Sequence, residues 1–273
     1  MTMQYAQVCL TLASDCHIGS GRAGMLAKSH RFIPAHVVSY ALAAAIGKSQ
    51  GGQYADFERA LEWLQKNTHC GPLFLQNPAL DNQVLLPKRD QQAIEQQFLV
   101  ASNHVTLHSQ TRSSVEGALF EVEVISASVV RGDHQGQATQ LLGGIWHTGE
   151  SINGKTVLDY LGDCLLGGEL KTGLGRIAHI VINESAADYV GIGRVDAQGL
   201  HLKQDDILLG VALDGVKEAA FYPWVGRLFD QEKGFGRRIS QAAFVAYDAA
   251  VQQSACFLPQ AKSDGFGCWQ VCG

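Results

Sequence analysis

The stretch "GGELKTGLGR" (residues 167–176) combines four glycines with a Lys-Thr pair and a closing arginine. Glycines cluster where a backbone bends sharply or comes very close to another group. The stretch therefore indicates a nucleotide phosphate loop, a contact to a nucleic-acid backbone, or a plain turn.

The sequence around this stretch excludes both phosphate-loop signatures. A Walker A loop places a glycine directly before the Lys-Thr pair and lies between a strand and a following helix. Here Leu170 precedes Lys171, and the flanking patterns predict a helix before the loop and a strand after it. A dinucleotide-binding G-x-G-x-x-G also fails, because Ala178 occupies the third glycine position. A contact to an extended anionic ligand is the better explanation, with a hairpin turn as the alternative.

Hydrophobic periodicity predicts the elements on both sides of the loop. Alternating or β-branched segments predict strands at residues 4–14, 118–130 and 176–184. Helical spacing predicts helices at residues 34–47, 54–67, 90–102 and 154–168. The order of strand, helix, strand region, helix, glycine loop and strand is the βαββαβ order of a ferredoxin-like fold with insertions. The chain is therefore expected to be of the α+β class.

The second part of the chain has a different pattern. Residues 1–185 are expected to form the ferredoxin-like domain, with an inserted segment at residues 50–115. Residues 186–273 are β-leaning, with few helix signals, and are expected to form a second unit packed on the first. A degenerate copy of the same fold is one interpretation of that unit.

Overall charge argues against a free-standing, non-specific nucleic-acid binder, because the net charge is −5 and the pI about 6.0. A local basic groove remains compatible with this total. Residues 16–50 contain no acid but several basic residues and histidines: Arg22, Lys28, Arg31, Lys48, His17, His30 and His36. A chance run on a solvated surface is the alternative.

The cysteines and the apolar runs indicate a reduced, cytoplasmic protein. Seven cysteines are scattered and include no C-x-x-C pair, which favours neither a disulfide framework nor a zinc ribbon. Cys268 and Cys272 form a C-x₃-C pair, which is too weak a pattern to predict a metal site. The longest apolar run has about eleven residues, too few to span a bilayer, and the start of the chain lacks the basic region of a secretory signal. No cofactor, metal or membrane partner is predicted.

Two further glycine-rich stretches share the character of residues 167–176. "HIGSGRAG" (residues 17–24) offers His17, Arg22 and backbone N–H groups. "EKGFGRRIS" (residues 232–240) places a phenylalanine between two glycines and follows it with two arginines. Phenylalanine can stack on a base and arginine can pair with phosphates, although a tight turn with the phenylalanine in the core is an equal alternative.

In this order, the three stretches resemble motifs of the RAMP superfamily, in particular subunits of type III CRISPR effector complexes. "HIGSG" followed by an "IP" helix start is similar to the opening of that family, with Ala35 and His36 where a glycine or small residue and a serine are usual. "TRSSVEGALFEVEVISA" (residues 111–127) resembles the segment that leads into a central strand in subunits that bind the 5′ handle of the guide RNA. Residues 167–176 match the family's glycine-rich loop, and "KGFGRRIS" matches a motif near the end of those subunits.

The resemblance implies a tandem or augmented RRM-like fold that caps the 5′ handle of a CRISPR guide RNA (crRNA). It implies contacts with other RAMP subunits and with the large subunit of the effector complex, and only indirect contact with target RNA. Single-stranded RNA is commonly recognised by stacking and backbone contacts, which suits such loops. The implied RNA contacts are His17, Gly19, Arg22, Arg112, Lys171, Gly173, Gly175, Arg176, Gly234, Phe235, Gly236 and Arg237.

The resemblance also implies two enzymatic alternatives to a non-catalytic role in antiviral defence. Backbone subunits of type III complexes cut target RNA with a loop aspartate, for which Asp15 is the candidate, but the expected loop "AGMLAKSHR" (residues 23–31) contains no acid. Guide-processing ribonucleases of the superfamily use a histidine as general acid or base. The candidates are His17, His30, His36, His104 and His108. The leading hypothesis is a non-catalytic guide-RNA-binding subunit.

Overall fold

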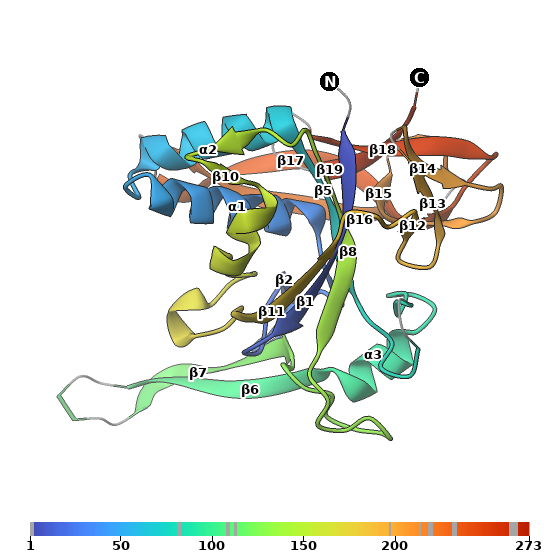
Figure 1. Cartoon of the computed structure of the whole chain (residues 1–273). Helices are drawn as coiled ribbons and strands as arrows, with labels where there is room; N and C mark the ends of the chain where they lie inside the picture. Colours follow the sequence, from blue (N-terminus) through green and yellow to red (C-terminus); the bar gives the residue numbers. More distant parts are fainter. Residues whose placement is uncertain are drawn as a thin grey trace.

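A computed structural model describes residues 3–80, 83–107, 110–111, 114–196, 198–212, 214–217, 221–230, 234–261 and 267–272. It contains three β-sheets of four or more strands and two long helices (Figure 1). The protein is of the α+β class, as predicted.

The central sheet has the strand order of a ferredoxin-like fold. It comprises β1 (Gln4–Leu12), β4 (Phe32–Ile33), β5 (Thr68–Leu75), β8 (Gln140–His147) and β11 (Ile177–Asn183). The spatial order is β11-β1-β8-β5-β4, and every neighbouring pair is antiparallel. Apart from the two-residue β4, the strands therefore lie in the order fourth, first, third, second. This is the sheet of the predicted βαββαβ unit.

Helices α1 (Ala35–Ser49) and α2 (Tyr54–Asn67) pack together on one face of the central sheet (Figure 1). Pro34 precedes α1, where a missing N–H costs nothing. In α2, Gln53 and Asp56 form a reciprocal capping box, with the Gln53 N–H bound to Asp56 Oδ2 at 3.0 Å. Both predicted helices are confirmed. Their apolar side chains join Val8 and Leu10 of β1 in the main core.

The helix predicted at residues 154–168 is wrong in type and length. The structure has instead the short strands β9 (Ser151–Ile152) and β10 (Lys155–Thr156), followed by a single 3₁₀ segment, η1 (Leu158–Asp163). Cys164 is already extended, with φ −75° and ψ 144°. Glycines at 162, 167 and 168 weaken any longer helix, while the apolar spacing still buries Leu158 and Leu161.

Two strands of the sheet, β5 and β8, did not show in the sequence pattern. β5 contains Gly71 and Pro72, and its pairing with β8 is irregular between Cys70 and Leu73. Proline is tolerated in a strand at such a bulge. Gly143 of β8 makes room for it, since a Cβ there would lie 2.4 Å from the Pro72 carbonyl oxygen. The strand region expected between the helices therefore lies at β5 and β8, not at residues 118–130.

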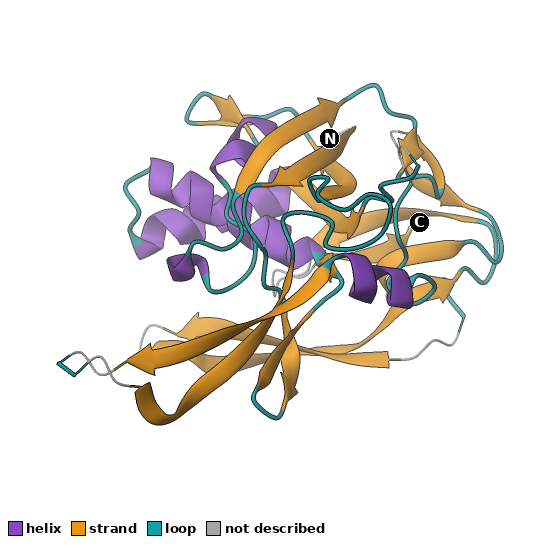
Figure 2. Ribbon diagram, turned by 90° about the horizontal axis from the view of Figure 1, so that it is seen from below, coloured by secondary structure: helices purple, strands orange, loops and turns teal. Residues whose placement is uncertain are grey.

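The strand predicted at residues 118–130 exists but belongs to another sheet. β7 (Ser114–Ile125) pairs with β6 (Leu99–Leu107) and, in parallel, with β3 (Leu26–Ser29), which pairs with β2 (Gly19–Ala23). The β6–β7 hairpin extends far from the body of the protein (Figures 1 and 2). The helix predicted at residues 90–102 is shortened to α3 (Gln91–Gln97), because β6 begins at Leu99.

The second part of the chain forms an eight-stranded sheet, as its β-leaning pattern predicted. Its strands are β12 (Asp188–Tyr189), β13 (Gly193–Asp196), β14 (Gly199–Leu202), β15 (Ile207–Ala212), β16 (Phe221–Asp230), β17 (Gly234–Ala250), β18 (Ala255–Ala261) and β19 (Gly267–Val271). Within the described residues from Asp188 onward there is no helix, so this part forms a sheet without helical cover of its own.

An aromatic cluster joins the second sheet to the central one. Trp146 lies 4.9 Å from Tyr5, 5.7 Å from Tyr189 and 5.4 Å from Trp269, measured between ring centroids. Tyr5 and Trp146 belong to the central sheet, whereas Tyr189 and Trp269 belong to the second. These four rings are 7% exposed or less. Strands β5 and β8 of the central sheet are therefore buried on both faces, whereas the edge strand β11 is largely exposed.

Candidate nucleic-acid interface

The segment that leaves β1 joins three parts of the protein. The Asp15 carboxylate accepts a hydrogen bond from the Ala127 N–H at 2.8 Å, and Cys16 exchanges two backbone hydrogen bonds with Ile125 at the base of the β6–β7 hairpin. On the other side, the His17 carbonyl accepts the Gly168 N–H at 2.8 Å. The stretch at residues 17–24 is thus hydrogen-bonded to the stretch at residues 167–176, and the two together are called the joined stretches.

The loop at residues 167–176 is held by its own close backbone contacts. A Cβ at Gly167 would lie 2.2 Å from the His17 carbonyl oxygen, and a Cβ at Gly175 would lie 2.1 Å from that of Leu166. Both glycines have positive φ, at +84° and +77°, so no other residue fits there without strain. Gly175 also donates its N–H to Asp15 O at 2.8 Å. These two glycines serve the packing of protein against protein.

Gly173 differs from Gly167 and Gly175. Its φ is +92°, and a Cβ there would meet no atom within 4 Å. It ends the short 3₁₀ segment η2 (Leu170–Thr172). The open space beside Gly173 is available to a ligand.

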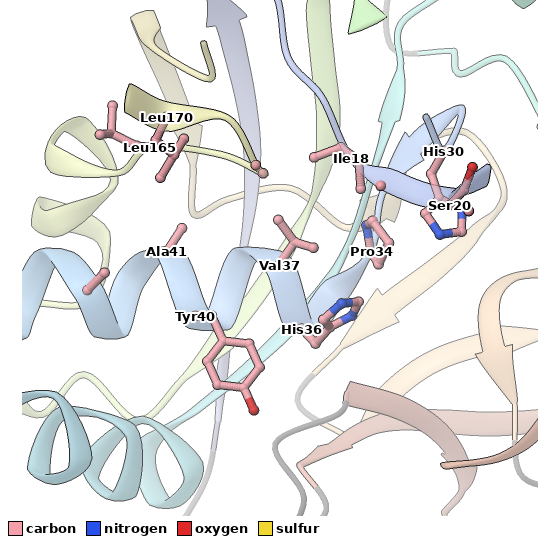
Figure 3. Close-up of a pocket in the computed structure, with 15 residues that line it drawn as sticks. Ile18, Ser20, His30, Pro34, His36, Val37, Tyr40, Ala41, Leu165 and Leu170 are labelled. Atoms are coloured by element: carbon pink, nitrogen blue, oxygen red, sulfur yellow. The ribbon is translucent and has the colours of Figure 1, made fainter. Parts of the chain in front are cut away.

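The two joined stretches form one side of a pocket of about 730 Å³. The start of α1 supplies the other side (Figure 3). Figure 3 shows Leu165 and Leu170 at one end and His30 and Ser20 at the other. The described lining residues are Ile18, Gly19, Ser20, Gly21, His30, Pro34, His36, Val37, Tyr40, Ala41, Ala44, Leu165, Gly167, Gly168 and Leu170. The lining is largely apolar and contains no acid.

The two histidines of the pocket are electrically neutral near pH 7. Burial, together with the neighbouring Arg31, lowers the pKa of His30 to about 4. Burial, together with His30, lowers the pKa of His36 to about 3. Their imidazoles can exchange hydrogen bonds or pack against a ring, but they supply no positive charge to the pocket.

Positive charge comes instead from exposed side chains on the joined stretches. Arg22 lies on β2, Lys171 lies in η2, and Arg176 closes the glycine-rich loop, and all three are exposed. Among the described residues, none of the three forms an ion pair. Unpaired guanidinium and ammonium groups remain available for phosphate.

The side chain of His17, a predicted RNA contact, is mostly buried and contacts the protein itself. It is 8% exposed, and its Nδ1 lies 2.7 Å from the Glu123 carbonyl oxygen. A Cβ at Gly19 would lie 3.6 Å from His17 Nε2, and a Cβ at Gly168 would lie 3.6 Å from its Cδ2. Glycines of both stretches therefore flank the remaining edge of the ring.

Two loop predictions need correction. "HIGSGRAG" is not all loop, because Gly19–Ala23 forms the exposed strand β2. "EKGFGRRIS" is not a loop either, because the backbone of Gly234, Phe235, Gly236 and Arg237 begins β17 and pairs with β16, with Phe235 opposite Phe229. The side chains of this segment, and the whole of Arg112, lie outside the described residues.

Several pocket residues were not predicted as contacts. His30, His36, Tyr40 and Leu165 line the pocket, but the sequence points only to the two histidines, as members of an acid-free window and as candidate general acids or bases. That window was the available signal, since it spans β2, β3 and α1, which surround the pocket.

In the described part of the chain, no group of three or more histidine, cysteine or acidic side chains could hold a metal ion. No helix there is long and apolar enough to cross a bilayer.

Comparisons with known proteins give structural neighbours but no family. No protein-family model matches the sequence, and no curated protein matches it. A chain from a cryo-EM structure of the Type III-B Cmr-beta bound to cognate target RNA matches with a TM-score of 0.44 and 10% identity, over 65% of this protein and 96% of that chain. A chain from the structure of the Type III-B Cmr-beta bound to cognate target RNA and AMPPnP, in state 1, matches with a TM-score of 0.44 and 13% identity, over 91% of this protein and 84% of that chain.

Proposed function

We propose that this protein is a non-catalytic guide-RNA-binding subunit of a type III CRISPR ribonucleoprotein that recognises the 5′ handle. It would work in the cytoplasm, in contact with neighbouring RAMP subunits and the large subunit. Target RNA would be reached only through the guide. The observation that carries the proposal is the hydrogen bond from Gly168 to His17, which joins two of the three stretches that resemble RAMP motifs.

The chemistry of the joined stretches supports a single-stranded RNA ligand. Three exposed cations, Arg22, Lys171 and Arg176, are available for phosphates. The adjoining pocket is largely apolar and acid-free, and it is lined in part by the neutral imidazoles of His30 and His36. Charged groups for a backbone beside a low-polarity hollow for bases suit a single strand better than a duplex.

The surroundings of Asp15 support a non-catalytic role over target-RNA cleavage by this residue. Its Oδ1 accepts the Ala127 N–H at 2.8 Å, and its carbonyl accepts the Gly175 N–H at 2.8 Å. Both the carboxylate and the carbonyl of Asp15 therefore accept hydrogen bonds from the protein's own backbone. Replacing Asp15 by alanine in the assembled complex should therefore weaken folding while leaving metal-dependent cleavage of target RNA intact.

A guide-processing endoribonuclease is the second candidate, because two histidines line the pocket. With pKa values of about 3 and 4, His36 and His30 are unprotonated at neutral pH but are weaker bases than a histidine with a pKa near 7, which suits general base catalysis. No described acid lines the pocket to act as the partner. Incubating the purified protein with repeat RNA separates the candidates: site-specific cleavage that is lost in His36→Ala or His17→Ala would favour the nuclease.

Crosslinking tests the binding proposal directly. The protein co-expressed with guide RNA is irradiated, and RNA-linked peptides are identified by mass spectrometry. Crosslinks to residues 17–24, 30–41 and 165–176, competed by RNA with an intact handle but not with a scrambled one, would support the proposal. Crosslinks confined to other parts of the chain, or equal competition by both RNAs, would refute it.

A further inference from the structure

Two cysteines lie opposite each other in the second sheet, far from the pocket. Cys256 is the second residue of β18, and Cys272 directly follows β19. The antiparallel register pairs Phe257 with Val271, which places Cys256 opposite Cys272. The Cys272 N–H donates to the Cys256 carbonyl oxygen at 2.8 Å. Their side chains therefore leave the sheet on the same face.

The positions of the two cysteines meet the geometric demands of a disulfide. Opposite residues of a hydrogen-bonded antiparallel pair have Cα atoms about 5.5 Å apart, within the range of about 4.4–6.8 Å that disulfides span. The two sulfurs lie 2.7 Å apart, and each lies 3.3 Å from the Gln198 carbonyl oxygen. Both residues are partly exposed, so small oxidants and alkylating reagents can reach them.

We propose that Cys256 and Cys272 form a reversible disulfide that fastens β19 to β18. The oxidant is a low-molecular-weight disulfide of the glutathione class. The thiolate of one of the two cysteines attacks one sulfur of that disulfide and releases one small thiol, which gives a mixed disulfide. The sulfur of the other cysteine then attacks the protein sulfur of the mixed disulfide and releases the second small thiol. Two protein thiols are oxidised to one disulfide, and one small disulfide is reduced to two thiols.

The surroundings of the pair hold its protons more tightly. Burial, the neighbouring Cys272 thiol and Asp196 raise the pKa of Cys256. Because the thiolate is the nucleophile, the pair must lose one proton before the first attack.

The strand that the disulfide would fasten carries a contact between the two sheets. β19 holds Trp269, which packs against Trp146 and Tyr189 and donates its Nε1–H to the Leu209 carbonyl oxygen at 2.7 Å. β19 also pairs with β15 through Trp269 and Ala212. A covalent link at the end of β19 should therefore help to hold Trp269 in place against Trp146 of the central sheet.

The test uses the full chain in a series of ratios of oxidised to reduced glutathione, quenched with iodoacetamide. We expect one peptide pair linked through Cys256 and Cys272, complete reversal by dithiothreitol, and a higher Tm in the oxidised sample. Cys256→Ser and Cys272→Ser should lose both the link and the oxidation-dependent rise in Tm. Cys268→Ser, which removes the neighbouring cysteine of β19, is the matched control and should keep both.

Three results would overturn the proposal. Both thiols could remain fully alkylated at every glutathione ratio. The linked peptides could instead contain Cys268, with the link lost in Cys268→Ser. The pair could be protected from alkylation by added zinc and not by oxidation, which would identify a metal site in its place.

Discussion

The Gly168 N–H donates a hydrogen bond to the His17 carbonyl oxygen over 2.8 Å, joining chain segments about 150 residues apart. The contact is possible because Gly167, next in the chain, has no side chain to strike the same carbonyl. Two stretches that each resemble an RNA-binding motif thereby become one surface.

Substitutions can distinguish the glycines of residues 167–176 that pack against protein from Gly173, which lies beside open space. Gly175→Ala should destabilise the fold by roughly 2 kcal/mol or more, because the residue has positive φ and its Cβ would lie 2.1 Å from the Leu166 carbonyl oxygen. Gly173→Asn, at a left-handed position with open space, should fold with nearly normal stability, because asparagine tolerates this conformation. Thermal unfolding checks the first effect, and RNA affinity checks whether Gly173→Asn impairs binding. Equal loss of stability in both variants would contradict the distinction.

The exposed cations should contribute to RNA affinity through phosphate contacts. Lys171→Ala, Arg176→Ala and Arg22→Ala should each weaken RNA binding and reduce the salt dependence, with the slope of log K against log salt falling by about 0.7 per lost contact. Lys66→Ala, on α2 and also exposed, is a control of the same charge change. Fluorescence anisotropy at several salt concentrations measures the slopes. Identical slopes in Lys171→Ala and Lys66→Ala would argue against an RNA contact at Lys171.

The partly buried histidines of the pocket should make the protein less stable in mild acid. An unfolded chain protonates histidine near pH 6.5, whereas His30 and His36 resist protonation down to about pH 4 and 3. The stability that they contribute is therefore complete above pH 6.5 and is lost as the pH falls below it, by roughly 2 kcal/mol per histidine at pH 5. Urea unfolding at pH 7.5 and pH 5 measures the loss, which should be smaller in His36→Gln. His179→Gln, at an exposed position of β11, should behave like the unaltered protein.

The aromatic cluster should be essential to the joint between the sheets. Trp269→Ala removes a ring that is 1% exposed and touches both Trp146 and Tyr189. We expect a loss of about 3–5 kcal/mol in the free energy of unfolding. Trp269→Phe should recover part of it, because a smaller ring still fills some of the space. Chemical unfolding followed by far-UV circular dichroism tests both variants.

The sequence predicted those elements whose hydrophobic spacing and end residues are typical of the secondary structure that they form. α1 and α2 begin and end within about two residues of the prediction, because their apolar spacing, Pro34 and the capping residues all agree with a helix. β5 and β8 could not be found in the same way. Both are buried on two faces, so they lack alternation, and Pro72 with its glycine neighbours suggests a turn unless the partner strand is known.

The candidate site shows the same division. The glycine-rich stretches were visible in the sequence, but whether a glycine admits a ligand or another part of the protein depends on what lies beside it. Gly167 and Gly175 are used for packing, and only the position of His17 and Leu166 reveals this. His36 and Tyr40 enter the pocket because α1 lies beside the joined stretches, a relation between distant segments that no local pattern carries.

The most direct test of the central claim is the nucleic-acid content of the protein expressed with its gene neighbours. We expect the chain to elute from size-exclusion chromatography in a large particle with a high ratio of absorbance at 260 nm to 280 nm. Guide RNA of defined 5′ end should be extractable from that particle. The double variant with Arg22→Glu and Lys171→Glu should no longer enter that particle. Elution as an RNA-free species, with normal folding and all neighbours present, would contradict the claim.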